Sequence, residues 1–147
     1  MPGLFDSRPR GLMAGNNIFF ATFVVLASWN DTHTFNPHWT RHAKFHSGQT
    51  LSFGVLSALT STYLLHRRNP TAAAGKDSLF MAAVVGSLTA VSGLSAIFYP
   101  DSAWMDPEWD NGWPIGPNGV LFLANLVATW MGYSYEKARL DKLDKKD

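Results

Sequence analysis

The sequence predicts an all-α integral membrane protein: a single domain of 147 residues that forms a four-helix transmembrane bundle. The main observation is the placement of charge. Four windows contain no Asp, Glu, Lys or Arg, so the 12 basic and 11 acidic residues crowd into the rest of the chain; these windows are residues 11–29, 47–65, 78–100 and 111–135. A helix needs about 20 apolar residues to cross roughly 30 Å of hydrocarbon, and each window has about that length. A soluble amphipathic helix would instead carry a charged face.

The four helices are predicted at about residues 11–29, 37–66, 78–99 and 114–138. The first ends at Trp29, an aromatic residue of the kind found at the membrane interface. The second is predicted to begin at Pro37 with Asn36 as its cap, because proline suits a first helical position where no amide bond is lost. Pro100 ends the third helix, and the fourth begins near Pro114.

The distribution of Lys and Arg predicts the orientation. Ten of them lie near the N-terminus, between the second and third helices or near the C-terminus: Arg8, Arg10, Arg67, Arg68, Lys76, Lys137, Arg139, Lys142, Lys145 and Lys146. The two loops on the opposite side carry only Arg41 and Lys44. The positive-inside rule therefore predicts a multi-pass protein with both termini in the cytoplasm. The closing residues 145–147 weakly favour the endoplasmic reticulum in a eukaryote.

Composition excludes several classes of protein. The chain has no Cys, which removes disulfides, a thiolate nucleophile and Cys-based metal sites. No segment resembles a Gly-rich phosphate loop or a dinucleotide-binding fingerprint, so we expect no cofactor. A net charge of +1 gives no electrostatic basis for a nucleic-acid partner. The expected partners are membrane lipid and a lipophilic small molecule.

A row of polar residues on the second predicted helix is the strongest functional signal. His38, His42, His46 and Gln49 are separated by 4, 4 and 3 residues, which places them on one helix face, and Phe53 continues that face deeper. Polar side chains are costly toward lipid, so this face is predicted to line the bundle interior or a wet cavity.

The loops on the non-cytoplasmic side supply the other candidates. Histidine titrates near neutral pH, and a nearby carboxyl group can orient it or supply a proton. We therefore predict catalytic roles for His42 and His46 as the central acid–base pair, with Asp31 and either Asp101 or Asp106 orienting or protonating. The predicted substrate-binding residues are His33, His38, Trp39, Gln49, Phe53, Tyr99, Trp104, Glu108, Trp109, Trp113 and Asn125. The Trp rings either contact the substrate or anchor the protein at the membrane interface.

Metal binding is an alternative interpretation of the same histidines. Two or three His at helical spacing together with a carboxylate can hold zinc or iron. Against it, Arg41 and Lys44 are interleaved with the histidines, and no Glu follows the first His as it does in zinc helices. We therefore predict no metal ligand, while a His-ligated metalloenzyme stays open.

One segment carries a resemblance. Asp31-x-His33-x-x-Asn36-Pro37-x-Trp39-x-x-His42-Ala43-Lys44-Phe45-His46 resembles small four-helix membrane proteins of unassigned function from bacteria and fungi, some of them encoded beside natural-product genes. More loosely, the chain is similar to membrane-embedded isomerases and cyclases of the emopamil-binding type, which use His and carboxylates in a lipid-open cavity. That likeness implies an enzyme acting on a lipophilic terpenoid or polyketide.

The resulting hypothesis is a cofactor-independent acid–base enzyme. The reaction we expect first is opening of an epoxide, ending in hydrolysis or cyclisation, and next the isomerisation of a double bond. The competing hypothesis is a membrane protein that binds a lipophile or assembles with a partner without catalysis. A homodimer is left open, because four short helices offer little wall for a closed chamber.

Overall fold

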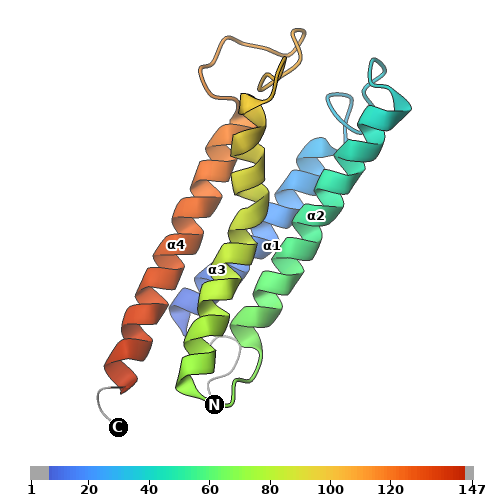
Figure 1. Ribbon diagram of the computed structural model, residues 1–147. Coiled ribbons are helices and arrows are strands. Elements are labelled where there is room, and N and C mark those ends of the chain that lie inside the picture. The colour runs from blue at the N-terminus through green and yellow to red at the C-terminus, as the bar shows by residue number, and fades with distance from the viewer. Residues whose placement is uncertain (1–6, 145–147) are drawn as a thin grey trace.

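The computed structural model describes residues 7–144, which form an all-α bundle of four helices (Figure 1). The helices are α1 (Arg8–Ser28), α2 (Arg41–His66), α3 (Ala72–Ser95), which continues into the short 3-10 helix η1 (Ala96–Phe98), and α4 (Pro117–Asp144). No strand occurs among the described residues. The all-α prediction is confirmed, whereas residues 145–147, on which the prediction of the endoplasmic reticulum rested, lie outside this part of the chain.

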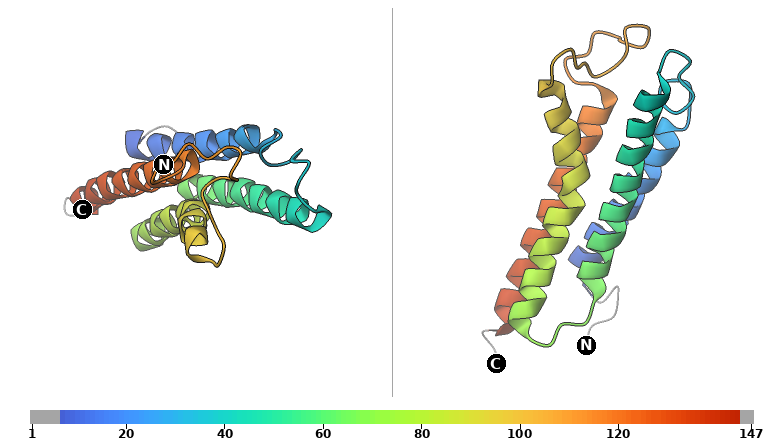
Figure 2. Two further views of the ribbon diagram at one scale, coloured as in Figure 1. Left: turned by 90° about the horizontal axis from the view of Figure 1, so that it is seen from above. Right: turned by 45° about the vertical axis from the view of Figure 1, so that its right-hand side comes forward.

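The helices run alternately up and down. Each packs against the next in the chain, and α4 also packs against α1, so the four close into a ring (Figure 2). The N- and C-terminal ends of the bundle and the short α2–α3 connection lie together at one end, which we call the terminus end. The two long connections, residues 29–40 and 99–116, meet at the other end, which we call the loop end.

Helix α2 begins four residues later than predicted. Its cap is Thr40, whose Oγ1 accepts the backbone N–H of Ala43 at 3.2 Å. Asn36 caps a local turn instead, because its Oδ1 accepts the N–H of His38 at 2.9 Å. His38 therefore lies in the connection, outside α2.

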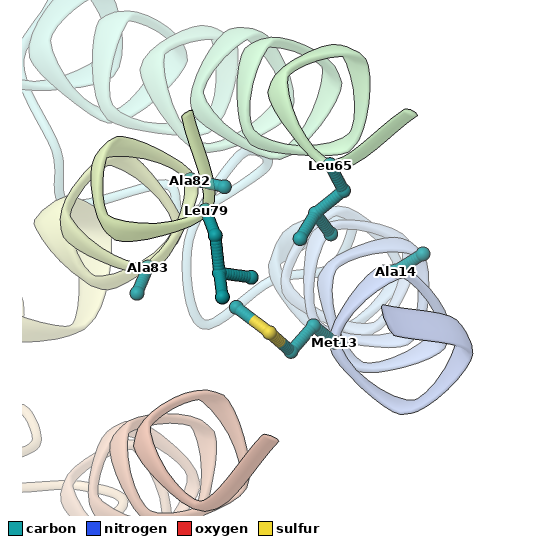
Figure 3. Close-up of a cluster of buried hydrophobic side chains, with 6 residues drawn as sticks. All are labelled: Met13, Ala14, Leu65, Leu79, Ala82 and Ala83. Carbon is teal, nitrogen blue, oxygen red and sulfur yellow. The ribbon is translucent and has the colours of Figure 1, made fainter. Parts of the chain in front are cut away.

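A cluster of buried apolar residues lies at the terminus end. Six buried residues from α1, α2 and α3 form one cluster there: Met13, Ala14, Leu65, Leu79, Ala82 and Ala83 (Figure 3). Leu64, Tyr133 and Leu140 pack against it, the last two from α4. Because all four helices meet in this cluster, the terminus end is the closed end of the bundle.

A chain of buried hydrogen bonds crosses the middle of the bundle. Asn17 of α1 donates to Ser61 Oγ of α2 at 2.8 Å, and Ser61 Oγ donates to the carbonyl of Ala82 in α3 at 2.7 Å. On the neighbouring face, Asn16 donates to Thr129 Oγ1 of α4 at 3.1 Å. Such bonds between helices fix their register in an apolar environment.

Gly86 gives a test of this close packing. A Cβ at position 86 would meet Asn17 Oδ1 at 2.9 Å and Ser61 Oγ at 3.0 Å. We expect Gly86→Ala to lower the free energy of unfolding by roughly 1–3 kcal/mol through overpacking. The matched control is Gly48→Ala in α2, where nothing lies within 4 Å of the added Cβ. Alanine is the better helix former, so thermal unfolding in detergent should show the control unchanged or stabilised. Equal loss in both variants would contradict the packing.

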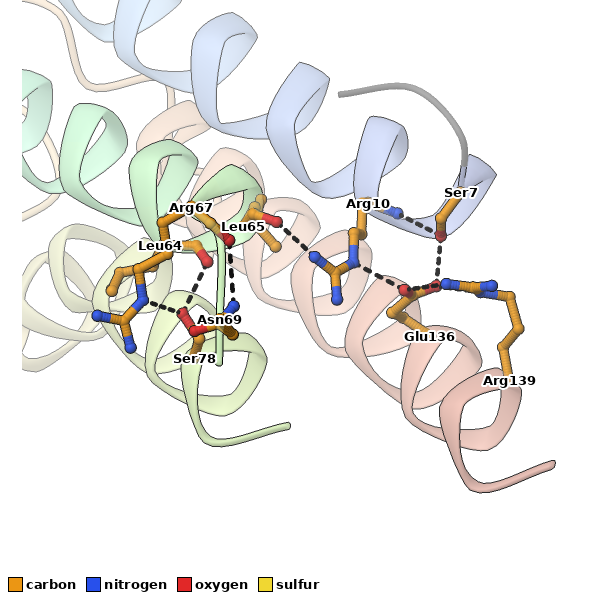
Figure 4. Close-up of polar contacts among 9 residues, drawn as sticks. All are labelled: Ser7, Arg10, Leu64, Leu65, Arg67, Asn69, Ser78, Glu136 and Arg139. Atoms are coloured by element: carbon orange, nitrogen blue, oxygen red, sulfur yellow. Dashed lines mark hydrogen bonds and ion pairs between the residues drawn. The ribbon is translucent and has the colours of Figure 1, made fainter. Parts of the chain in front are cut away.

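Charged side chains tie α1 to α4 at the terminus end (Figure 4). The carboxylate of Glu136 is fully buried and receives hydrogen bonds from Ser7, from Arg10 Nε at 2.7 Å and from Arg139 Nη2 at 2.8 Å. Arg10 also donates to the carbonyl of Leu65 at 2.6 Å, which attaches the end of α2 to the same cluster. We call Ser7, Arg10, Glu136 and Arg139 the terminus clasp.

The bundle has small or polar side chains inside and many large apolar side chains outside. Alanine, glycine, serine and threonine dominate the buried positions of α2 and α3. The exposed large side chains come from all four helices and include Phe19, Leu26, Leu56, Leu59, Val91 and Val127. Among the described residues, two helices are long and apolar enough to cross a membrane, Arg8–Ser28 and Ala72–Phe98.

Candidate functional site

Two neighbouring pockets lie at the loop end and share five lining residues. These are Ala27, His33, Trp39, Asn118 and Leu121. The first pocket has a volume of about 620 Å³ and the second about 430 Å³. Together we call them the loop-end cavity, and the individual pockets lobe one and lobe two. Volumes of this size suit a small organic ligand.

The lobes differ in the elements that line them. Lobe one lies against α1, both long connections and the start of α4; besides the shared residues, its lining includes Phe23, Trp104, Met105, Asp106, Trp109 and Val120. Lobe two lies between α1, α2 and α4, and its lining includes Val24, Ala43, His46, Thr50, Leu51 and Phe122. Both are mostly apolar with a few polar groups, which is typical of a ligand site.

His33 is the imidazole that borders both lobes, and its hydrogen bonds determine its tautomer. Asn30 Nδ2 donates to the carbonyl of Ala27 at 2.9 Å, so Asn30 Oδ1 is the acceptor of the amide. That oxygen accepts the Thr32 hydroxyl at 2.7 Å. Thr32 Oγ1 must then accept from His33 Nδ1–H, which lies 2.7 Å away. His33 Nε2 is left with a lone pair and forms no hydrogen bond to any described residue.

The surroundings of His33 favour the neutral ring. Burial lowers the pKa of His33 below its ordinary value of 6.5, and the nearby charge of Asp106 offsets part of that shift. A neutral imidazole with a free Nε2 is the form that accepts a proton. At neutral pH this side chain is therefore equipped as a base.

Asp106 joins the two long connections. Its Oδ2 accepts hydrogen bonds from Asn36 Nδ2 and from Trp39 Nε1, both at 3.2 Å. Asn36 is almost fully buried, which makes this contact part of the local core. Oδ1 of Asp106 forms no hydrogen bond among the described residues, and Asp106 lines lobe one. The carboxyl group thus orders the site and presents one oxygen for chemistry.

Trp39 holds His33 in place. The two rings meet edge to face, with centroids 5.6 Å apart and an interplanar angle of 71°. Since Trp39 also donates to Asp106, one indole contacts both the base and the carboxyl group. His33, Trp39 and Asp106 thus form one connected group, which we call the His33–Asp106 site.

The predicted central pair lies at the edge of the cavity. His42 and His46 are one turn apart on α2, with their Nε2 atoms 3.1 Å apart, and His46 Nδ1 lies 3.1 Å from Gln49 Oε1. All three residues are exposed, and only His46 lines the cavity, in lobe two. The structure therefore brings His42, His46 and Gln49 together on α2, and His46 shares lobe two with His33 and Trp39.

The other predicted residues divide between the cavity and the surface. Trp104 and Trp109 line lobe one. Asp31, His38 and Glu108 line a separate pocket of about 380 Å³ on the outer side of the connections, together with Trp109. The remaining exposed residues, none of which lines the cavity, are Phe53, Tyr99, Asp101 and Trp113.

Asp101 and Asn125 have environments of their own. Asp101 is exposed and has a positive φ of 58°, a conformation of tight turns. Asn125 of α4 is buried, and both polar atoms of its side chain lack a hydrogen-bond partner in the structure. Neither side chain lines the cavity, so the structure places both apart from the predicted chemistry.

Sequence reasoning missed several residues of the site. Asn36 was interpreted only as a helix cap, whereas its amide binds Asp106. Asn30 and Thr32 fix the tautomer of His33, and the spacing of the two is a known turn signal that could have found them. Asn118 and Leu121 line both lobes, but no local pattern marks them.

No group of three or more His, Cys, Asp or Glu side chains that could hold a metal ion occurs within residues 7–144. The polar groups of the His33–Asp106 site are one imidazole, one carboxyl group and one indole N–H, and the amide of Asn36 binds the carboxyl group. This donor set suits proton transfer and hydrogen bonding.

Fold and site define a small all-α protein with a largely apolar cavity that contains an imidazole and a carboxyl group. The chain belongs to DUF6640, a family of unknown function, whose model matches residues 14–147. No curated protein and no solved structure matches the chain. Its function must therefore be argued from the cavity itself.

Proposed function

We propose that the chain is an integral membrane acid–base enzyme acting on a lipophilic small molecule. The observation that carries this proposal is that a neutral imidazole and a carboxyl group border the same apolar cavity. Pairs of titratable groups in a largely apolar pocket are typical of acid–base catalysts. The predicted central role passes from His42 and His46 to His33, because only His33 borders both lobes.

The distribution of side chains supports the membrane assignment. In water, large apolar residues gather inside, whereas here they cover the outside of all four helices and small residues fill the interior. Membrane bundles show this arrangement because lipid solvates the outer face and small residues let the helices approach closely. The charge distribution supports cytoplasmic termini, with the loop-end cavity on the opposite side.

The absence of Cys gives a direct test of this topology. Ser102 is exposed at the loop end, and Asp77 is exposed in the first turns of α3 at the terminus end. Replacing each in turn by Cys introduces a single thiol for labelling. We expect a membrane-impermeant maleimide to label Ser102→Cys in intact cells and Asp77→Cys only after the membrane is opened. The unmodified chain is the blank. The reverse pattern would contradict the orientation, and recovery of the protein in the soluble fraction would contradict the membrane assignment.

Epoxide opening is the reaction that the site supports best. The reacting state has Asp106 protonated, and its proton passes to the epoxide oxygen as one C–O bond breaks, which leaves an electron-poor carbon. Water or a double bond of the same molecule attacks that carbon, and His33 Nε2 takes the proton then released. Transfer of this proton from His33 back to Asp106 restores both groups for the next turnover. The rings of Trp39, Trp104 and Trp109 are suited to stabilise the positive charge. Attack by water gives a diol, and internal attack gives a ring.

The substrate class follows from the cavity and from the resemblance. An apolar cavity at the end of a membrane bundle suits a molecule that partitions into lipid. A terpenoid or polyketide skeleton is what the loose sequence resemblance to emopamil-binding-type enzymes would imply, and it is the class to test first. Double-bond isomerisation uses the same two groups, one to give a proton and one to remove another, and is the second reaction to test.

The pH dependence of turnover tests the role of His33. Because burial lowers the pKa of His33 below 6.5, the neutral base persists to a lower pH than for an ordinary histidine. The acidic fall in turnover should therefore have its midpoint below pH 6.5. The measurement is product formation from a panel of lipophilic epoxides and dienes by membranes containing the protein. An acidic midpoint above pH 6.5 would contradict a half-buried imidazole base.

A non-catalytic lipophile-binding protein is the second candidate. This candidate is favoured by the hydrogen bonds of Asp106 to Asn36 and Trp39, which join the two connections. They give the carboxyl group a structural role that requires no catalysis. In that case membranes would retain a lipophilic ligand unchanged, and His33→Ala would alter its affinity without the accumulation of any precursor. A homodimer would show as a doubled mass in detergent and would serve either function.

A further inference from the structure

We propose that His42 and His46 form a two-ligand site for a divalent transition metal ion such as Zn²⁺. The site goes beyond the acid–base function and does not depend on it, because the His33–Asp106 site contains neither residue. The two histidines follow each other by one turn near the start of α2. Their Nε2 atoms converge to 3.1 Å.

The distance between the two nitrogens fits one shared ion. Zinc binds histidine nitrogen at about 2.0–2.1 Å, so two such ligands at angles between square and tetrahedral lie roughly 2.9–3.4 Å apart. The observed separation of 3.1 Å falls within that range. The separation of the two nitrogens therefore already matches the spacing that a shared ion requires.

Neighbouring side chains orient both rings. Gln49 Oε1 lies 3.1 Å from His46 Nδ1 and, as a carbonyl oxygen, it accepts the Nδ1–H. His46 Nε2 then carries a lone pair, as a metal ligand must. The ring of Phe45 lies parallel to that of His42, within 4°. Outer partners of this kind commonly fix the tautomer and orientation of metal-binding histidines.

Metal binding requires one tautomer change. Without an ion, His46 Nε2 accepts a hydrogen bond at 3.1 Å, so His42 Nε2 carries the proton. When an ion binds, that proton moves to His42 Nδ1, and both Nε2 lone pairs point to the metal. This rearrangement releases no net proton, because the proton moves from one nitrogen of the ring to the other.

The surroundings leave the ion open to further ligands. Both histidines are exposed, so water can complete the coordination. Lys44 follows His42 by two residues, which places it about 200° from His42 around the helix axis. Its positive charge therefore lies on the opposite side of the helix from the ion. Borderline ions such as Zn²⁺, Ni²⁺ and Cu²⁺ suit imidazole ligands of this type. Since His46 lines lobe two, the ion would lie at the edge of the cavity.

The test is metal binding by the full chain in detergent, purified without a polyhistidine tag. Titration calorimetry with Zn²⁺ should show one site in the wild type, weakened roughly tenfold or more in His42→Ala and in His46→Ala. Gln49→Leu should weaken it by about tenfold, because the outer partner is lost. With Cu²⁺ as probe, electron paramagnetic resonance should show nitrogen ligands that disappear in the double variant.

The matched controls are His38→Ala and His66→Ala, which remove the other exposed or half-buried histidines outside the cavity. Both should bind Zn²⁺ as the wild type does. The proposal is overturned if the double variant binds as tightly as the wild type, or if the control variants lose binding equally. Since all four positions lie at the protein surface or a helix end, unchanged circular dichroism confirms that each variant is folded.

Discussion

Replacement of His33 by Ala is expected to lower turnover by roughly 10²–10⁴-fold, the usual contribution of a general base. The reason is that Nε2 of this ring is the proton acceptor available to both lobes of the cavity. Substrate affinity should change much less, because most of the lining is apolar and stays in place. The measurement is kcat and KM for the product-forming reaction in reconstituted membranes, with protein abundance determined in parallel.

Two further variants make this result specific. His66→Ala removes an imidazole at the terminus end whose buried Nε2 has no hydrogen-bond partner, so it should leave turnover unchanged. Thr32→Val removes the hydroxyl that fixes the tautomer of His33, 2.7 Å from Nδ1, and should lower kcat by less than His33→Ala does. If His33→Ala retained full turnover, the base would have to be another group.

Replacement of Glu136 by Ala is expected to produce the largest loss of stability. The buried carboxylate receives hydrogen bonds from Ser7, Arg10 and Arg139, and its removal leaves two guanidinium groups without their anion. Breaking a buried ion pair from one side costs about 3–5 kcal/mol. The lower part of that range applies, because Arg10 and Arg139 are partly exposed and water can solvate them. Thermal unfolding in detergent measures the effect.

The matched control for this variant is Asp77→Ala. Asp77 is an exposed acid at the same end of the bundle, in the first turns of α3. Its loss should change the unfolding temperature little, because exposed charges contribute little to stability. Glu136→Gln keeps the shape and part of the hydrogen bonding, so its effect should lie between the two. Equal unfolding temperatures for Glu136→Ala and Asp77→Ala would contradict a structural role for the terminus clasp.

The fold followed from a long-range property of the sequence. Each of the four charge-free windows is long enough to cross a membrane as a helix, so the sequence predicted four helices. The described residues form four α-helices. The ends of the helices were less predictable, because an Asn side chain can cap either a helix or a turn. Asn36-Pro37 has the features of a helix start, yet Asn36 caps a turn and binds Asp106, and the real cap is Thr40. Tertiary contacts decided between two locally reasonable structures.

The site was predictable only in part. Helical spacing correctly brought His42, His46 and Gln49 together, because neighbours on a helix face depend on sequence alone. The pairing of His33 with Asp106 depends on how two connections fold against each other across the loop end, which periodicity does not encode. The choice among Asp31, Asp101 and Asp106 was therefore open in the sequence, and the geometry favours Asp106.

The architecture explains why the cavity lies where it does. At the terminus end all four helices contribute to one cluster, and the terminus clasp holds α1, α2 and α4 together. At the loop end α3 lines neither lobe, and the space between α1, α2 and α4 is left to the cavity. A packed end and a hollow opposite end are a suitable arrangement for positioning the residues that line the cavity.

The most direct test of acid–base chemistry in the loop-end cavity is untargeted mass spectrometry of membranes from hosts that express the wild type, His33→Ala or His66→Ala. The hosts are supplied with the panel of lipophilic epoxides and dienes as substrates. We predict a lipophilic product in the wild type and His66→Ala that is lost in His33→Ala. Its precursor should accumulate at equal mass for cyclisation or isomerisation, or one water lighter for hydrolysis. Identical metabolites in all three membranes, at equal protein abundance, would contradict catalysis and favour the binding protein.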